Sequence, residues 1–282
     1  MTTTFELPSF EDPPVIEVAA SVQFDPLAKL TVPYLGMLWQ RFRKEYPVVD
    51  QQPPLAPVIE RLGVSGQNIG LRLEMMGNIT PRLWFSNTQG DHLVQVQNDR
   101  FILNWRRVAG AGNPYPRYQQ HIRPQFLTEY ARFQQFLIDE NLGAAHVNQC
   151  ELTYINQIEP NEYWTSHADV ASVFRGWTHE YAAVNEYPVE ALQISVSHVI
   201  TDTSGAFVGR LHVALQSALT RSMPESPAEK PVFVLTLTAR GRPMGDGDAG
   251  MVGFLDLAHK AIVTSFDRIT TEEAHKVWRK EQ

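Results

Sequence analysis

The sequence predicts an α+β protein whose strands pair mainly antiparallel, and three observations lead to this fold class. Several short segments alternate apolar and polar side chains, which is the pattern of a strand with one buried face. These segments follow one another with short connections, and strands joined in this way pair antiparallel. Only a few segments carry apolar residues at helical spacing, and each of them adjoins a group of strands.

The first elements are a strand and a helix. Val15–Phe24 alternates in polarity and predicts a strand with one solvent-facing side. Thr31 and Pro33 then begin a helix, because proline is tolerated in a first turn, and Pro47 ends it. The other elements expected in this half are a proline-rich loop at Gln51–Pro57, strands at Leu71–Met76 and Arg82–Phe85, and a helix at Pro124–Leu142.

The stretch His92–Arg107 predicts a hairpin that turns at Asn98 and Asp99. A two-residue turn fixes the register, so that Val96 faces Phe101 and the other pairs follow from it. One face of the hairpin is then apolar and the other is mainly polar. The residues of the apolar face are Val94, Val96, Phe101, Leu103 and Trp105.

The second half repeats this pattern. Asn148–Ile158 predicts a strand with Cys150 on its buried side, and Ser166 with Asp169 forms a capping-box pattern that begins a short helix. The remaining expected elements are strands at Leu192–Ile200, Arg210–Leu219 and Val232–Arg240, a helix at Met251–Ile269, and a last short helix begun by a box of Thr270 and Glu273.

The order of elements in residues 1–145 therefore recurs in residues 146–282, and we expect two similar halves that arose by duplication. Each half would contain a strand, a helix, three or four antiparallel strands and a second helix. Each half's sheet would bury its apolar face under its own helices and leave the opposite face polar and open to solvent. This predicts a saddle-like or helix-grip arrangement of two sheets. The element order resembles the repeat of the TATA-binding-protein-like fold, a likeness that carries no function.

Three segments carry a family resemblance: Pro13–Val18, Leu93–Arg107 (LVQVQNDRFILNWRR), and Leu255–Thr270 (LDLAHKAIVTSFDRIT), which Glu273, His275 and Trp278 follow. Together they resemble a sporadically distributed family of uncharacterised bacterial proteins of about this length, and the hairpin is the most specific part. The resemblance implies a bacterial origin and a chain of two halves. It supplies no catalytic residue.

Composition and charge argue against several classes of protein. Lys and Arg number 24 against 31 Asp and Glu, and the formal net charge of -7 makes nucleic acid a poor partner. The single cysteine, Cys150, excludes an internal disulfide and suits a reducing compartment. Residues 1–14 show no leader pattern, and no run reaches the roughly 18 apolar residues of a membrane span. We therefore expect a cytoplasmic protein with no membrane partner.

A literal G-x-G-x-x-G pattern is formed by Gly245, Gly247 and Gly250. Asp246 and Asp248 would place carboxylates where a pyrophosphate binds, and no further parallel strand follows, so we interpret the pattern as a loop that leads into the last long helix. The nine histidines include no H-E-x-x-H pair and no Cys/His cluster. Neither a metal nor a cofactor is expected.

Asp256 and His259 lie one turn apart on the predicted last long helix. Such a pair could orient an imidazole for acid and base catalysis. On an amphipathic helix, polar neighbours at this spacing more often face water or border the core, so a structural role is favoured. No catalytic residue is assigned.

The most distinctive feature is a surface rather than a motif. The predicted solvent-facing sides of the strands are rich in amides, hydroxyls and Arg and poor in Lys and Glu, a mixture that suits hydrogen-bonded recognition. The candidate binding residues of this polar sheet face are Gln95, Gln97, Arg100, Asn104 and Arg106 in the first half and Gln193, His212, Gln216 and Arg240 in the second, with Gln23, Ser195, Ser197, Thr236 and Thr238 beside them.

The leading hypothesis is a non-enzymatic binding protein that uses the polar sheet face to hold a protein or peptide partner, or a second copy of itself in a homodimer. One alternative is an enzyme or small-ligand sensor with a pocket between sheet and helices, using His212, Arg240 or the Asp256 and His259 pair. Nucleic-acid binding is a third hypothesis, which the net charge disfavours. A deep pocket with converging His, Arg and carboxylate groups would favour the enzyme, and an open polar sheet would favour binding.

Overall fold

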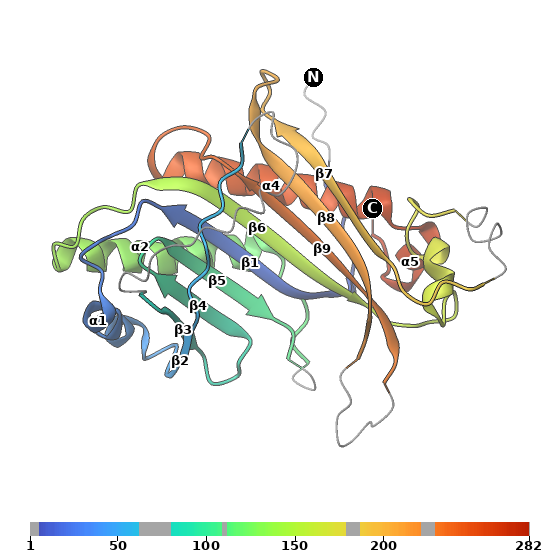
Figure 1. Ribbon diagram of the computed structural model, residues 1–282, viewed down its shortest axis with the longest axis horizontal. Coiled ribbons are helices and arrows are strands. Elements are labelled where there is room, and N and C mark those ends of the chain that lie inside the picture. The colour runs from blue at the N-terminus through green and yellow to red at the C-terminus, as the bar shows by residue number, and fades with distance from the viewer. Residues whose placement is uncertain (1–5, 62–79, 109–111, 179–186, 221–228, 282) are drawn as a thin grey trace.

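The computed structural model describes residues 6–61, 80–108, 112–178, 187–220 and 229–281. Within them, the strands form one antiparallel nine-stranded sheet in the order β2-β3-β4-β5-β1-β6-β9-β8-β7 (Figure 1). The strands are β1 (Val15–Phe24), β2 (Val48–Gln52), β3 (Arg82–Ser86), β4 (His92–Gln97), β5 (Arg100–Arg106), β6 (Val147–Ile158), β7 (Gln193–Thr201), β8 (Phe207–Leu219) and β9 (Pro231–Gly241). The helices are α1 (Val32–Phe42), α2 (Arg123–Asp139), α4 (Gly247–Ile269) and α5 (Glu272–Val277), with a π-helical turn at Tyr118–Ile122 before α2 and a 3₁₀ turn at His167–Ser172.

The α+β class is confirmed, but the expectation of two separate sheets is wrong. β1 pairs with β5 on one side and with β6 on the other, so the first strands of the two halves join them into a single sheet. The pairing is in register over most of its length, with Val22 opposite Cys150. This long-range pairing buries the edges that two separate sheets would have exposed.

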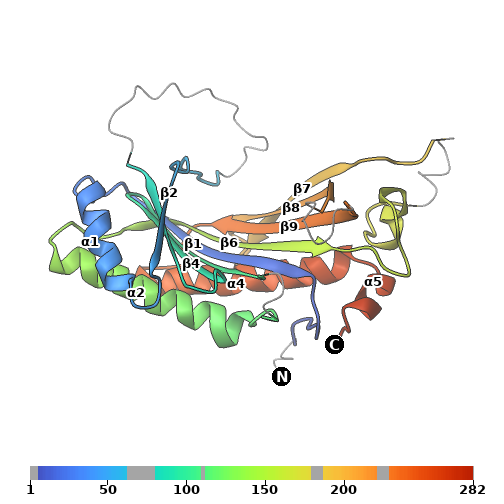
Figure 2. The same ribbon diagram turned by 90° about the horizontal axis from the view of Figure 1, so that it is seen from below.

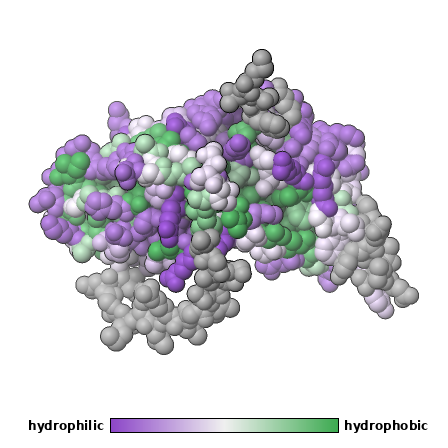
Figure 3. Space-filling model, turned by 90° about the horizontal axis from the view of Figure 1, so that it is seen from above, coloured by the Kyte–Doolittle hydropathy of each residue, from purple (hydrophilic) through white to green (hydrophobic). Residues whose placement is uncertain are grey.

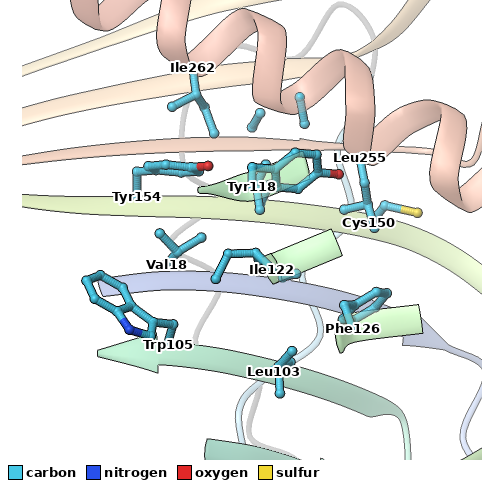
Figure 4. Close-up of a cluster of buried hydrophobic side chains, with 14 of the residues drawn as sticks. Val18, Leu103, Trp105, Tyr118, Ile122, Phe126, Cys150, Tyr154, Leu255 and Ile262 are labelled. Atoms are coloured by element: carbon cyan, nitrogen blue, oxygen red, sulfur yellow. The ribbon is translucent and has the colours of Figure 1, made fainter. Parts of the chain in front are cut away.

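The core lies between the sheet and the helices α2 and α4, which run along the same face of the sheet (Figure 2). The stripe of α2 meets the hairpin strands, and the Phe133 ring stacks on Phe101 at 5.4 Å between ring centroids. α4 contributes Leu255 and Ile262, which lie over the sheet in the close-up of the core (Figure 4). Both helices are therefore held by the apolar face of the sheet, as their spacing predicts.

The hairpin register is confirmed at each pair, with Val96 opposite Phe101 and Gln97 opposite Arg100 around the Asn98 and Asp99 turn. Trp105 is buried, with 2% of its surface exposed. Its ring meets the edge of the Tyr115 ring at 5.9 Å between centroids. The apolar face of the hairpin therefore faces the core.

Other elements differ in detail from the expectations. The expected strand at Leu71–Met76 lies outside the described residues, and β2 was not predicted because residues 48–52 lack alternation. The Ser166 and Asp169 capping box is present. The last helix is capped by Thr271, whose side chain accepts the Ala274 N–H, and not by Thr270.

The surface mixes polar and apolar residues. On the face seen from above, hydrophilic residues predominate and hydrophobic ones occur in patches between them (Figure 3). Among the described residues, no helix is long and apolar enough to cross a membrane.

Candidate functional site

The polar sheet face lies opposite α2 and α4, and a segment of the chain itself covers part of it (Figures 1 and 2). This segment, residues 53–61, follows β2 and crosses over the strands; we call it the strap. Pro53, Pro54 and Pro57 occur in it, and proline favours extended backbone both at its own position and at the residue before it. The strap therefore presents an extended backbone to the sheet.

The first hydrogen bonds to the strap are made to the backbone of Leu55 and Ala56. The Gln97 side chain accepts the Leu55 N–H through Oε1 and donates to the Leu55 carbonyl oxygen through Nε2, both at 2.9 Å. Arg100 donates to the Ala56 carbonyl oxygen at 3.0 Å and also to Gln23 Oε1 at 2.7 Å. These bonds do not depend on the side chains of Leu55 or Ala56.

Two more glutamines bond the strap further along. Gln23 Oε1 accepts the Val58 N–H at 3.0 Å, and Gln149 Oε1 accepts the Glu60 N–H at 2.9 Å. Gln23 and Gln149 lie opposite each other on the central strands β1 and β6. Both side chains are buried, and a buried amide without these partners would lose hydrogen bonds that water can no longer replace.

The strap's anchor is the Glu60 carboxylate, which enters a cluster of basic side chains. Arg210 lies 2.7 Å from Oε2, His212 Nε2 lies 2.6 Å from Oε1, and Arg240 lies 3.4 Å from Oε1. Burial alone would raise the pKa of Glu60, but the hydrogen bonds from His212 and Arg210 and the Arg240 charge outweigh it and lower the pKa to about 2. The cluster therefore binds an ionised carboxylate.

The expectation that this face is open to solvent is wrong for much of it. Gln95, Gln97 and Asn104 are only 6%, 3% and 3% exposed. Gln95 donates to Asn104 at 2.6 Å and accepts from Arg82 at 2.8 Å, and Asn104 donates to Glu17 at 2.6 Å. Arg106 lies beside them, 3.7 Å from Glu17. The residues Gln95, Asn104 and Arg106 thus form a polar network next to the strap rather than contacts to it.

Gln193 and Gln216 do not join the others. They lie opposite each other on β7 and β8, they are exposed, and neither makes a hydrogen bond to the described part of the strap. Of the nine predicted binding residues, the structure brings four to the strap, namely Gln97, Arg100, His212 and Arg240.

Three contributing residues were missed: Gln149, Arg210 and Glu60. The alternation of β6 places Gln149 on the same side as Glu151, so the strand pattern contained enough information to find it. Glu60 gave no such indication, because it lies in a loop and its contacts reach residues as far away in the sequence as Arg240.

Ser197, His212 and Glu60 are aligned like a nucleophile, a base and an acid, with Ser197 Oγ 2.9 Å from His212 Nδ1. Two features oppose catalysis. The Glu60 charge is shared with Arg210 and Arg240, so little of it is left to stabilise an imidazolium. Ser197 is also exposed at the surface, so bulk water is not excluded from its hydroxyl.

Asp256 and His259 form hydrogen bonds to other residues rather than to each other. Asp256 accepts hydrogen bonds from the Tyr118 hydroxyl at 3.1 Å and from Arg123 at 2.9 Å. His259 Nδ1 lies 3.1 Å from the Tyr154 hydroxyl. The pair therefore does not act as a carboxylate that orients an imidazole, although His259 lines a cavity between α4 and the sheet.

The remaining chemical candidates are structural. Cys150 is buried, and burial raises the pKa of its thiol to about 12, so the thiolate is scarce at neutral pH. Gly245 and Gly247, with φ of 110° and 58°, form the turn that leads into α4. Within the described ranges, no group of three His, Cys, Asp or Glu side chains is arranged to hold a metal ion.

Comparisons with known proteins do not indicate a function. The predicted likeness to a family of uncharacterised bacterial proteins stays a prediction. No protein-family model, no curated protein and no solved structure matches this chain.

Proposed function

We propose that this is a non-enzymatic binding protein whose polar sheet face holds an extended, proline-rich segment of a partner protein, anchored by one acidic side chain. The observation that supports the proposal is the way the strap is held. Its contacts come from β4, β5, β1, β6, β9 and β8, which are consecutive in the sheet. The face thus offers one continuous track of donors and acceptors for an extended chain.

The contacts define which segment would fit. Backbone N–H groups are needed at the positions of Leu55, Val58 and Glu60, and a carboxylate is needed at the last of these. Proline suits the intervening positions, because it lacks an N–H and keeps the backbone extended before binding. Recognition through the backbone tolerates different side chains, as it does when a peptide adds to a sheet.

The strap is a competitor built into the chain. A tethered segment acts at an effective concentration in the millimolar range, so a free segment of equal affinity is excluded while the strap is seated. A partner would bind when the strap leaves the face or loses its anchor. The strap of a second copy would satisfy the same contacts, and self-association is therefore the alternative that a test has to separate.

We also propose that the halves 1–145 and 146–282 arose by duplication and form a saddle-like whole. Outward from the centre of the sheet, the first half places β1, β5, β4 and β3, and the second places β6, β9, β8 and β7 in the matching order. In each half a long helix follows the last strand, α2 in the first half and α4 in the second, where the short helix α5 comes after it. We further propose a cytoplasmic location. The single cysteine supports it, because such a chain suits a reducing compartment.

The test uses a labelled peptide of residues 52–61 (QPPLAPVIER) and a protein with Glu60→Ala, in which the strap has lost its carboxylate. Fluorescence anisotropy should show saturable binding of the peptide to this variant. Wild type should bind it at least roughly tenfold more weakly, because its own strap competes. Light scattering at the same concentrations should show a monomer, which separates partner binding from strap exchange.

Two further variants provide matched controls in the Glu60→Ala background. Gln97→Ala removes the contacts to Leu55 and should weaken peptide binding, whereas Gln193→Ala changes an exposed glutamine without a hydrogen bond to the strap and should leave it unchanged. A folded Glu60→Ala protein that binds no peptide would refute the proposal. Equal affinities of the two glutamine variants would show that the peptide binds elsewhere.

A further inference from the structure

A second candidate site lies on the opposite side of the sheet. A cavity of about 560 Å³ opens between α4, the sheet and the N-terminal residues 6–10. Its walls include Leu237 of β9 and Ile262 and Phe266 of α4, and Figure 4 shows Tyr118 and Tyr154 near Ile262, between sheet and helix. The volume lies in the range of small-molecule sites, roughly 300 to 1,000 Å³. The described structure thus has room for a ligand that the strap does not touch.

One part of the cavity wall is polar but uncharged. The Tyr115 and Tyr154 hydroxyls are 2.8 Å apart, and Tyr154 lies 3.1 Å from His259 Nδ1. The Tyr118 ring stacks on His259 at 4.3 Å between centroids. Burial lowers the pKa of His259 to about 4, against the opposing effect of Asp256, so the imidazole is neutral at physiological pH. This chain of groups can donate or accept a hydrogen bond without bearing charge.

Three charged residues also line the cavity: Glu6, Arg117 and Glu281. Arg117 donates to Ser9 Oγ at 3.0 Å and lies 3.8 Å from Glu281, so its charge is partly matched. The Arg117 backbone has a φ of 66°, a strained conformation for a residue with a side chain. Strain of this kind, directly before a π-helical turn, is typical of functional sites.

We propose that this cavity binds a neutral, mainly apolar small molecule with one hydroxyl, carbonyl or amine group, which bonds to the Tyr115, Tyr154 and His259 chain. Apolar walls supply most of the binding free energy, and the uncharged chain orients the polar group. An anion is disfavoured, because no lining cation is free of a carboxylate and two carboxylates line the cavity. This site is independent of the peptide-binding face.

The test compares two dyes with the same ring system. N-phenyl-1-naphthylamine is neutral and carries one N–H, and 1-anilinonaphthalene-8-sulfonate adds a single negative charge. Fluorescence titration of the full chain should show saturable binding of one neutral dye per molecule and at least roughly tenfold weaker binding of the sulfonate. Equal affinity for the two dyes, or no saturable binding of the neutral one, would overturn the proposal.

Variants on α4 locate the bound dye. Val263 lines the cavity, so Val263→Phe should fill it and weaken binding of the neutral dye at least roughly tenfold. Val252→Phe makes the same change on α4 away from the cavity lining and should leave affinity unchanged. Val263→Leu fills less of the cavity and should weaken binding by a smaller factor, and it serves if Val263→Phe does not fold. Unaltered binding in folded Val263→Phe, or in folded Val263→Leu where the first variant fails to fold, would place the dye elsewhere and contradict the assignment.

Discussion

The side-chain amide of Gln97 hydrogen-bonds both the N–H and the carbonyl oxygen of Leu55, each at 2.9 Å. A neighbouring β-strand would offer an extended chain the same pair of bonds. Here a side chain of β4 supplies them, so the strap can cross the strands instead of adding to the edge of the sheet. At this position the polar sheet face therefore holds the strap through its backbone.

Removing the Gln97 amide should destabilise the protein. Gln97→Ala leaves the N–H and carbonyl of Leu55 without these partners, and we expect the free energy of unfolding to fall by roughly 1 to 3 kcal/mol. Gln193→Ala, at an exposed site, should change it by no more than about 0.5 kcal/mol. Urea denaturation of both variants measures the difference. Similar losses would mean that the Leu55 bonds contribute nothing measurable.

The Glu60 anchor should be lost in acid. Burial raises the pKa of Glu60, but His212, Arg210 and Arg240 together lower it to about 2 from an ordinary value of 4.5. The stabilisation that the ionised Glu60 carboxylate gives to the bound strap is therefore complete above pH 4.5 and is lost as the pH falls from 4.5 toward 2. Arg240 also pairs with a second carboxylate, that of Glu151, beside the Glu60 anchor.

The corresponding measurement titrates the 52–61 peptide and its Glu60→Gln version into the Glu60→Ala protein between pH 7 and the lowest pH at which the protein stays folded. The affinity advantage of the carboxylate peptide should shrink as the solution is acidified below pH 4.5. A constant advantage across this range would contradict the ionised anchor.

His259 should make stability depend on pH in a different window. Burial lowers the pKa of His259 from 6.5 to about 4, while Asp256 opposes the shift, so the unfolded chain takes up the proton first. The contribution of the neutral imidazole is complete above pH 6.5 and is lost as the pH falls from 6.5 to 4. His259→Gln should lose less unfolding free energy than wild type between pH 7 and 4, by roughly 2 to 3 kcal/mol. Identical losses in the two proteins would refute this assignment.

Trp105 should be important for stability because it is 2% exposed within the core. Trp105→Ala should lower the unfolding free energy by roughly 3 to 5 kcal/mol, as truncation of a large buried aromatic does. Chemical denaturation checks this, and an unchanged midpoint would contradict the core assignment.

Local features of the fold could be predicted from the sequence, and long-range ones could not. The Val96 and Phe101 pairing follows from a two-residue turn and the alternation on either side of it. The pairing of β1 with β6 joins segments far apart in the chain, and no pattern in either strand specifies its partner. The cap of α5 differs by one residue, because Thr270 and Thr271 are adjacent and both can cap a helix.

The sequence predicted several residues of the candidate site, but not that another segment of the chain covers them. Strand alternation identified Gln97, Arg100 and Arg240 as members of one polar face. It could not show that a loop covers them, because the strap has no periodicity that indicates where it binds. The cavity was missed for a related reason, since its walls come from segments as distant as Tyr115, Leu237 and Phe266.

Backbone recognition at Leu55 is the central claim, and peptides with a methylated backbone nitrogen test it most directly. Three versions of the 52–61 peptide are titrated into the Glu60→Ala protein: unmodified, N-methylated at Leu55, and N-methylated at Ile59, whose N–H has no acceptor among the described contacts. Methylation at Leu55 removes the N–H that Gln97 accepts and should weaken binding at least roughly tenfold, a loss that Gln97→Ala in the protein should abolish. Methylation at Ile59 should have little effect. Equal affinities for the Leu55-methylated and unmodified peptides would contradict the account.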